Sequence, residues 1–141
     1  MRKTILTAVL LTLVLQAGHT ASAGIQEEIE KRQSDCVEKD PSTAGMTRCS
    51  EAAYEEWDRE LNNSYKRLLK AIPEEEGKAK VKEAQRAWLK FRDQEFKCID
   101  AVYAGMEGTM YIPMHAESRL RVVRERALLL GHYAELAESG K

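Results

Sequence analysis

The 141-residue sequence has few of the residues from which enzymes build an active site. It contains three cysteines and three histidines. His115 and His132 lie far apart in the sequence, and neither has a Cys or His partner at the spacing of a zinc site. No Ser, Thr or Cys stands in a recognisable nucleophile motif, and no glycine-rich phosphate loop opens a helix. We therefore expect a protein that is not an enzyme, with no catalytic residue, metal ion or cofactor.

The sequence also lacks an excess of basic residues. Lys and Arg number 22 against 23 Asp and Glu, which gives a formal net charge of −1. A nucleic-acid-binding domain usually carries a strongly positive surface, so we expect no nucleic-acid partner. A slightly acidic protein is better suited to meeting basic proteins.

The first 23 residues have the pattern of a cleaved signal peptide. Arg2 and Lys3 precede an apolar run at residues 5–15, and a small-residue cleavage site follows at Ala21, Ser22 and Ala23. The apolar run is too short for a bilayer span, so we expect no stable membrane insertion. The sequence thus predicts an exported protein, in the periplasm or outside the cell. Residues 24–141 form its single domain, with 20 basic and 23 acidic residues.

No stretch alternates apolar and polar residues as a half-buried strand does, and helices are predicted throughout. A short helix is expected over residues 25–37, with Ile25 and Ile29 on one face. A second helix is expected to begin near Thr43 as N-cap and to end at Pro73. Helical spacing gives it an apolar face of Ala53, Tyr54, Trp57, Leu61, Tyr65, Leu68 and Ile72.

Two more helices are predicted on either side of a break at Gly105, Gly108 and Pro113. The helix before the break runs to about Tyr103, and its apolar positions are Val81, Ala84, Trp88, Phe91, Cys98 and Val102. The helix after the break has an apolar face of Ala116, Leu120, Val123, Ala127, Leu130, Ala134 and Ala137. The fold class predicted is all-α, a small helical bundle built around a long antiparallel helical hairpin.

Polar residues on the inner flanks of this hairpin face one another if the chain turns near Pro73. Asp58 then lies opposite Arg92, and Asn62 lies near Gln85. We predict an Asp58–Arg92 salt bridge, supported by Asn62, Gln85 and Asp93, that fixes the register of the two helices. The alternative is a catalytic pair of Asp58 and Asp93. An arginine beside a carboxylate lowers its pKa and makes it a poor general acid, which favours the structural role.

The connection before the last helix is a candidate binding loop for a partner protein. It is longer than most connections and is rich in adaptable apolar side chains, namely Met106, Met110, Tyr111, Ile112 and Met114. The alternative is that this loop folds back and covers the open end of the hairpin with the same side chains.

Two pairings of the three cysteines fit the predicted helices in an oxidising compartment. Cys36 and Cys49 flank a loop containing Pro41 and Gly45. A disulfide there would stabilise the fold by about 3 kcal/mol in the chain-entropy model. The rival pairing is Cys49 with Cys98, because an antiparallel hairpin brings the start of one helix near the end of the next.

The two central helices carry a recognisable set of residues: Asp58, Leu61, Asn62, Tyr65, Ala84, Gln85, Arg86, Trp88, Arg92, Asp93 and Cys98. In this set, and over about residues 36–126, the chain resembles the LprI-like lysozyme inhibitor family. Many members of that family are known only as domains of unknown function. The resemblance implies a protein partner, lysozyme, that is blocked by the loop near Tyr111 or by a basic side chain such as Arg119. The alternative is a small envelope accessory or adapter protein with no lysozyme target.

Many members of that family carry a fourth cysteine just before the last helix, where this chain has Ser118. We expect the Cys36–Cys49 disulfide, with Cys98 unpaired and buried as a small core residue. The protein is then expected to be a monomer, and a dimer through Cys98 is the alternative.

Overall fold

The computed structural model describes residues 21–140 and consists of four α-helices in this range. They are α1 (Ala21–Lys39), α2 (Thr43–Ala71), α3 (Glu75–Tyr103) and α4 (Tyr111–Ser139). No strand occurs in the described range, so the all-α prediction is confirmed. The predicted signal peptide lies outside the described residues, apart from residues 21–23 at the start of α1. None of the described helices combines the length and the apolar character that a membrane span requires.

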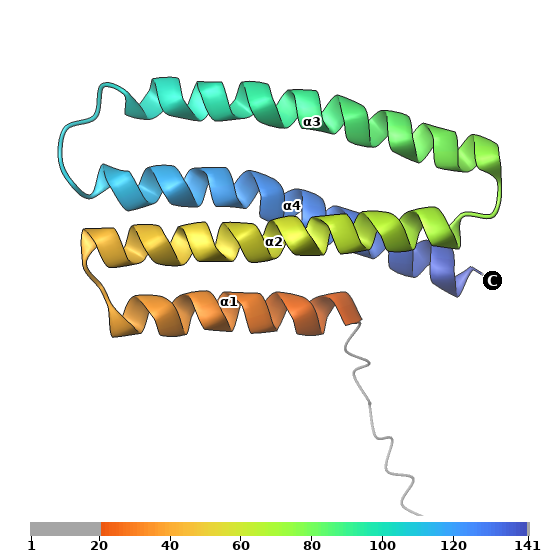
Figure 1. Ribbon diagram of the computed structural model, residues 1–141, viewed down its shortest axis with the longest axis horizontal. Helices are drawn as coiled ribbons and strands as arrows, with labels where there is room; N and C mark the ends of the chain where they lie inside the picture. Colours follow the sequence, from red (N-terminus) through yellow and green to blue (C-terminus); the bar gives the residue numbers. More distant parts are fainter. Residues whose placement is uncertain (1–20, 141) are drawn as a thin grey trace, which may run out of the picture.

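Helices α2 and α4 form the centre of the bundle. They run in the same direction, with α1 along one side and α3 along the other, both running the opposite way (Figure 1). The predicted long hairpin of α2 and α3 is present. However, α2 packs most extensively against α4, and α3 packs mainly against α4 as well. The main packing contact of the bundle is therefore not within the α2–α3 hairpin. It lies between α2 and α4, which are not consecutive in the chain.

The apolar faces predicted for α2 and α4 are confirmed as the core. Leu120 and Val123 are fully buried, and Trp57 is 1% exposed. Each buried side chain of this size contributes about 1.5–3 kcal/mol through removal from water. Alanines at 53, 127 and 134 are also buried, which lets the two backbones approach closely. α1 adds Ile29 to this core.

The face predicted for α3 is only partly correct. Phe91 and Val102 are each 55% exposed, and Ala84 and Cys98 are exposed as well. The face of α3 that contacts the other helices is rotated by about one residue from the predicted face. It consists of Gln85, Trp88, Arg92, Phe96 and Ile99. On this face Arg126 of α4 donates to Gln85 Oε1 from Nε at 3.1 Å and from Nη2 at 2.9 Å.

A disulfide between Cys36 and Cys49 joins α1 to α2, as predicted, with the two Cα atoms 5.8 Å apart. Cys98 is free, as predicted, but it is exposed and not buried. Ser42, not Thr43, is the N-cap of α2, and its Oγ accepts a hydrogen bond of 3.0 Å from Gly45 N. The tight turn between α1 and α2 is thus fixed both covalently and by a helix cap.

The connection between α3 and α4 is shorter than predicted. α4 begins at Tyr111, so Pro113 lies within its first turn, where a proline removes no intrahelical hydrogen bond. Pro113 is buried. Gly108 adopts φ +112°, which only glycine tolerates readily, and it reverses the chain between the two helices. Tyr111, Ile112 and Met114 are therefore held on a helix and not on a loop.

Candidate functional site

The polar network predicted across α2 and α3 is only partly assembled. Asp58, Asn62, Gln85 and Arg92 all line one cavity of about 380 Å³ between α2 and α3. The Asp58–Arg92 salt bridge is not formed. Arg92 pairs with Asp93 on its own helix at 2.7 Å, and Asn62 Nδ2 donates to the Asp58 carbonyl at 2.8 Å. Asn62 and Arg92 thus find partners on their own helices, and Gln85 finds its partner, Arg126, on α4.

Arginine and aromatic side chains alternate between α3 and α4, an arrangement that the sequence analysis missed. Arg92 lies over the rings of both Trp88 and Phe96, 5.8 Å from each centroid. Arg119 covers the other side of this set at 4.4 Å from Phe96, and Arg126 lies 5.6 Å from Trp88. Each such contact contributes about 0.5–1 kcal/mol at an exposed site. The signal available in the sequence is the four-residue spacing of Trp88, Arg92 and Phe96.

Burial shapes the electrostatics of this stack. It is the main cause that lowers the pKa of the Arg126 guanidinium, which has Gln85 as its hydrogen-bond acceptor. Burial is also the main cause that raises the pKa of Tyr54, whose ring lies 6.3 Å from that of Phe96. The stack forms a cationic and aromatic contact between α3 and α4.

Arg119, predicted as a partner-binding residue, is already engaged inside the protein. Besides its contact with Phe96, its Nη1 lies 3.6 Å from Asp100 Oδ1. The same carboxylate oxygen lies 2.7 Å from His115 Nε2. Arg119 is also set back along α4 from the predicted loop residues. The structure thus does not bring Arg119 together with the methionines of the α3–α4 connection.

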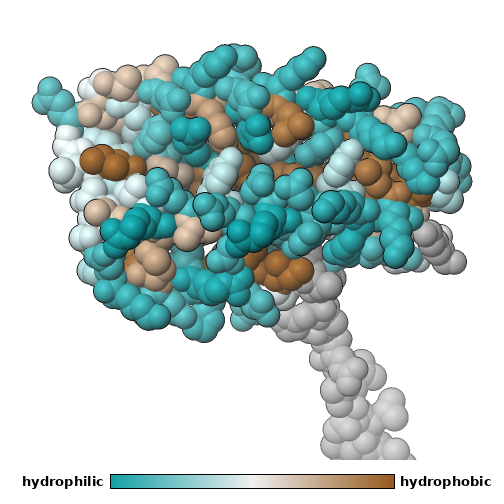
Figure 2. All heavy atoms as spheres, viewed as in Figure 1, coloured by the Kyte–Doolittle hydropathy of each residue, from teal (hydrophilic) through white to brown (hydrophobic). Residues whose placement is uncertain are grey.

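The remaining predicted binding residues gather at one end of the bundle. Met106, Met110, Ile112 and Met114, called here the methionine end, are 42%, 61%, 54% and 45% exposed. Figure 2 shows paler and brown side chains at the left-hand end of the molecule, where α3 and α4 connect, while hydrophilic side chains cover much of the rest. Each of these side chains is therefore partly in contact with the bundle and partly open to solvent. Tyr111 is half-buried.

Two cavities flank the methionine end. The larger, about 690 Å³, is lined by apolar Met46, Met110, Pro113 and Met114. Its polar wall includes Glu117, which accepts hydrogen bonds from Gln33 at 2.9 Å and Ser50 at 3.0 Å. The smaller, about 370 Å³, is lined by residues that include Met106, Tyr111, Ile112, Asp100 and His115. These surfaces offer adaptable apolar contacts, which suit a protein partner. No group of acidic, His or Cys residues suited to holding a metal occurs among residues 21–140.

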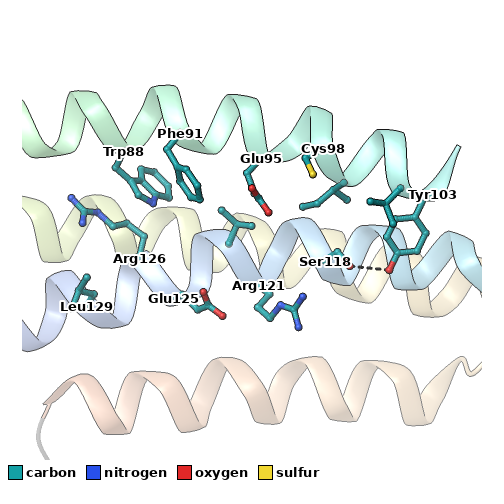
Figure 3. Close-up of a pocket in the computed structure, with 13 residues that line it drawn as sticks. Trp88, Phe91, Glu95, Cys98, Tyr103, Ser118, Arg121, Glu125, Arg126 and Leu129 are labelled. Atoms are coloured by element: carbon teal, nitrogen blue, oxygen red, sulfur yellow. Dashed lines mark hydrogen bonds between the residues drawn. The ribbon is translucent and has the colours of Figure 1, made fainter.

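A third cavity, of about 640 Å³, runs between α3 and α4. Figure 3 shows Trp88, Phe91 and Cys98 of α3 on one side of it, and Arg121, Glu125 and Leu129 of α4 on the other. The hydrogen bond of 3.0 Å between Tyr103 and Ser118 lies at one end of this groove. The groove is open and carries charges of both signs.

Comparisons with known proteins agree with this architecture. Residues 34–130 match the family described as lysozyme inhibitor LprI. A solved structure of an uncharacterized protein from Burkholderia thailandensis is similar, with 35% sequence identity and a TM-score of 0.73. The match covers 79% of this chain and 55% of that chain, so the present chain spans just over half the length of its relative. No curated protein matches the sequence. The family match covers well over half of the chain, and the chain belongs to the LprI lysozyme inhibitor family.

Proposed function

We propose that this protein inhibits lysozyme by direct contact, using the methionine end as its binding surface. The family match over residues 34–130 supports the inhibitory role, because the family is one of inhibitors and not of enzymes. The observation that carries the choice of surface is the exposure of Met106, Met110, Ile112 and Met114 at a single end of the bundle. Exposed apolar groups that cluster in this way mark interaction sites in soluble proteins.

The backbone at this end is suited to recognition. Ile112 and Met114 lie in the first turn of α4, which the buried Pro113 anchors to the bundle. A surface held on a helix loses little conformational entropy when it binds, whereas the unbranched methionine side chains can adapt to the partner's shape. The contact surface therefore has one part on a fixed helical backbone, Ile112 and Met114, and one part on the connection before it, Met106 and Met110.

Charge supports the choice of partner. Lysozymes of the animal type are basic, and this chain has a small excess of acidic residues. Opposite charges raise the rate of encounter, and added salt reduces this effect. We also propose that the protein acts outside the cytoplasm after removal of residues 1–23, which N-terminal sequencing of the exported protein would test.

The experiment is a titration of a c-type lysozyme with the purified, oxidised protein, following cell-wall lysis and calorimetric heat together. The expected result is saturable binding with a defined stoichiometry, weaker at high salt, and a matching loss of lysis. The double variant M110S/I112S should weaken binding by roughly tenfold or more, since central apolar contacts dominate such interfaces.

Leu136→Ser is the matched control, because Leu136 is 56% exposed and lies near the other end of α4. This control should bind like the unmodified protein. Absence of binding at low salt, by a protein that is helical in circular dichroism, would rule out c-type lysozyme and favour the envelope accessory role. Inhibition that survives M110S/I112S would move the contact to another surface.

A further inference from the structure

Glu117 of α4 is the one acidic residue among the described residues that line the cavity of about 690 Å³ beside the methionine end. Its side chain is half-buried. Its Oε2 accepts hydrogen bonds from Gln33 Nε2 of α1 at 2.9 Å and from Ser50 Oγ of α2 at 3.0 Å. Ser50 is itself only 6% exposed. Side chains from α1 and α2 therefore hold this carboxylate of α4 at a fixed place in the wall of the cavity.

The negative charge of Glu117 is not neutralised by a direct contact. No Lys, Arg or His side chain among residues 21–140 forms an ion pair with it, and both of its hydrogen-bond donors are neutral. Arg124 lines the same cavity, but its Nη1 lies 3.8 Å from Glu30 of α1. Arg121 lies one turn beyond Glu117 and is exposed, and its side chain extends from α4 away from α3 (Figure 3). The carboxylate is thus available to a positive group from outside the chain.

The other walls of the cavity suit the stem of a long basic side chain. Met46, Met110, Pro113 and Met114 supply apolar surface around Glu117. Lysine and arginine side chains place their apolar stems along such surfaces and carry the charge at the tip. Hydrogen bonds from such a tip to a carboxylate are roughly twice as strong as those between neutral groups. The cavity therefore offers complementary contacts to both parts of a lysine or arginine side chain.

A partner that binds the methionine end also covers this cavity, because Met110 and Met114 belong to both. Covering the cavity removes water from Glu117. Removal of a carboxylate from water is costly unless a positive group pairs with it. A partner surface without a basic group at this point would therefore bind weakly, whereas a basic side chain would offset the cost.

We propose that Glu117 receives a lysine or arginine side chain of the partner protein, and that this contact selects a basic partner. The inference rests on the proposed function, because it takes the methionine end as the binding surface. It reverses the polarity of the contact predicted for Arg119, since the acidic group lies on this protein and the basic group on its partner. Glu117 is then a specificity-determining residue beside the methionine end.

Calorimetric titration of a c-type lysozyme with the Glu117→Gln variant, in the oxidised protein expressed from its full sequence, tests the proposal. Glutamine keeps an oxygen that can accept from Gln33 and Ser50, so the urea midpoint should stay that of the unmodified protein. The affinity should fall by roughly tenfold or more, because a close charge pair across an interface contributes at least this factor. Glu125→Gln is the matched control. It removes the same charge from an exposed position of α4 that does not line the cavity, and it should bind like the unmodified protein.

Variants of the lysozyme identify the group that Glu117 receives. When each lysine and arginine of the lysozyme is replaced singly by alanine, one position should remove the difference in affinity between the unmodified protein and Glu117→Gln. The residue type at that position shows whether the group is an ammonium or a guanidinium. If the difference persists at every position, the proposal is overturned.

Arg121→Gln tests whether Glu117 is neutralised from within the chain on binding. Under the proposal this variant should bind at least as tightly as the unmodified protein, because it removes a competing positive charge. A loss equal to that of Glu117→Gln would reveal an internal pair and overturn the proposal. Lysozyme binding that Glu117→Gln leaves unchanged, or that Glu125→Gln weakens equally, would overturn it too and leave lysozyme inhibition standing. Absence of binding by the unmodified protein would overturn both.

Discussion

Reduction of the Cys36–Cys49 disulfide should destabilise the protein by about 3 kcal/mol. The two cysteines are 13 residues apart in sequence, and a cross-link that closes a loop of this size restricts the unfolded chain by about that free energy. Once the bond is reduced, α1 is held mainly by buried Ile29 and by ion pairs such as Arg32–Glu56. Exposed pairs of this kind contribute only about 0–1 kcal/mol. Loss of the disulfide should therefore remove most of the stabilisation that attaches α1 to α2.

Urea unfolding followed by circular dichroism measures this difference on the same chain, with and without a phosphine reductant. With a denaturant dependence of roughly 1.5 kcal/mol per molar urea, the midpoint should fall by about 2 M on reduction. A Cys36→Ala/Cys49→Ala variant should show no response to the reductant, and Cys98→Ser should respond like the unmodified protein. A midpoint difference below about 0.5 M would refute the reasoning, because the bond would then add little beyond the packing of α1.

Three further predictions concern the turn between α1 and α2 and the core. Gly45→Ala should cost about 1–3 kcal/mol in urea unfolding, because the added Cβ would overlap the backbone oxygen of Asp40. Leu120→Ala should cost about 2–5 kcal/mol, since Leu120 is fully buried, whereas Leu136→Ala on the surface should change stability by less than about 0.5 kcal/mol. Hydrogen bonds from Ser42, and then from Arg48, hold the pKa of Asp40 below its ordinary 3.8, so its contribution is complete above that value and is lost as the pH falls through the lowered pKa. Asp40→Asn should therefore flatten the acid side of a stability–pH curve, and an unchanged acid limb would contradict this assignment.

Much of the helical architecture was predictable from the sequence because apolar spacing and helix-ending residues are local signals. The stripe through Trp57 and Leu61 in α2, and that through Leu120 and Val123 in α4, identified the core correctly. Pairing between helices was less predictable. Either α3 or α4 could be the main partner of α2, and the structure places α4 there, with small buried residues such as Ala127 in the contact.

The face of α3 could not be predicted from apolar spacing alone, because this helix carries two usable faces. Spacing favoured Phe91 and Cys98, yet the bundle takes Gln85 and Arg92. Arg126 on α4 donates hydrogen bonds to Gln85, and these offset the free-energy cost of burying that polar side chain. The Asp58–Arg92 prediction was wrong for the same reason, since it treated α2 and α3 as a pair in isolation.

The parallel pairing of α2 with α4 has a consequence for how the chain folds. All of α3 is synthesised between these two helices, so the apolar face of α2 lacks its main partner until α4 has left the ribosome, and only α1 can pack on it before then. Contacts between distant segments slow folding relative to a bundle of consecutive hairpins. A nascent chain that ends within α3 therefore exposes Trp57 and Leu61 to solvent and to chaperones. The core of the bundle is therefore completed by the last of the four helices and not by a local hairpin.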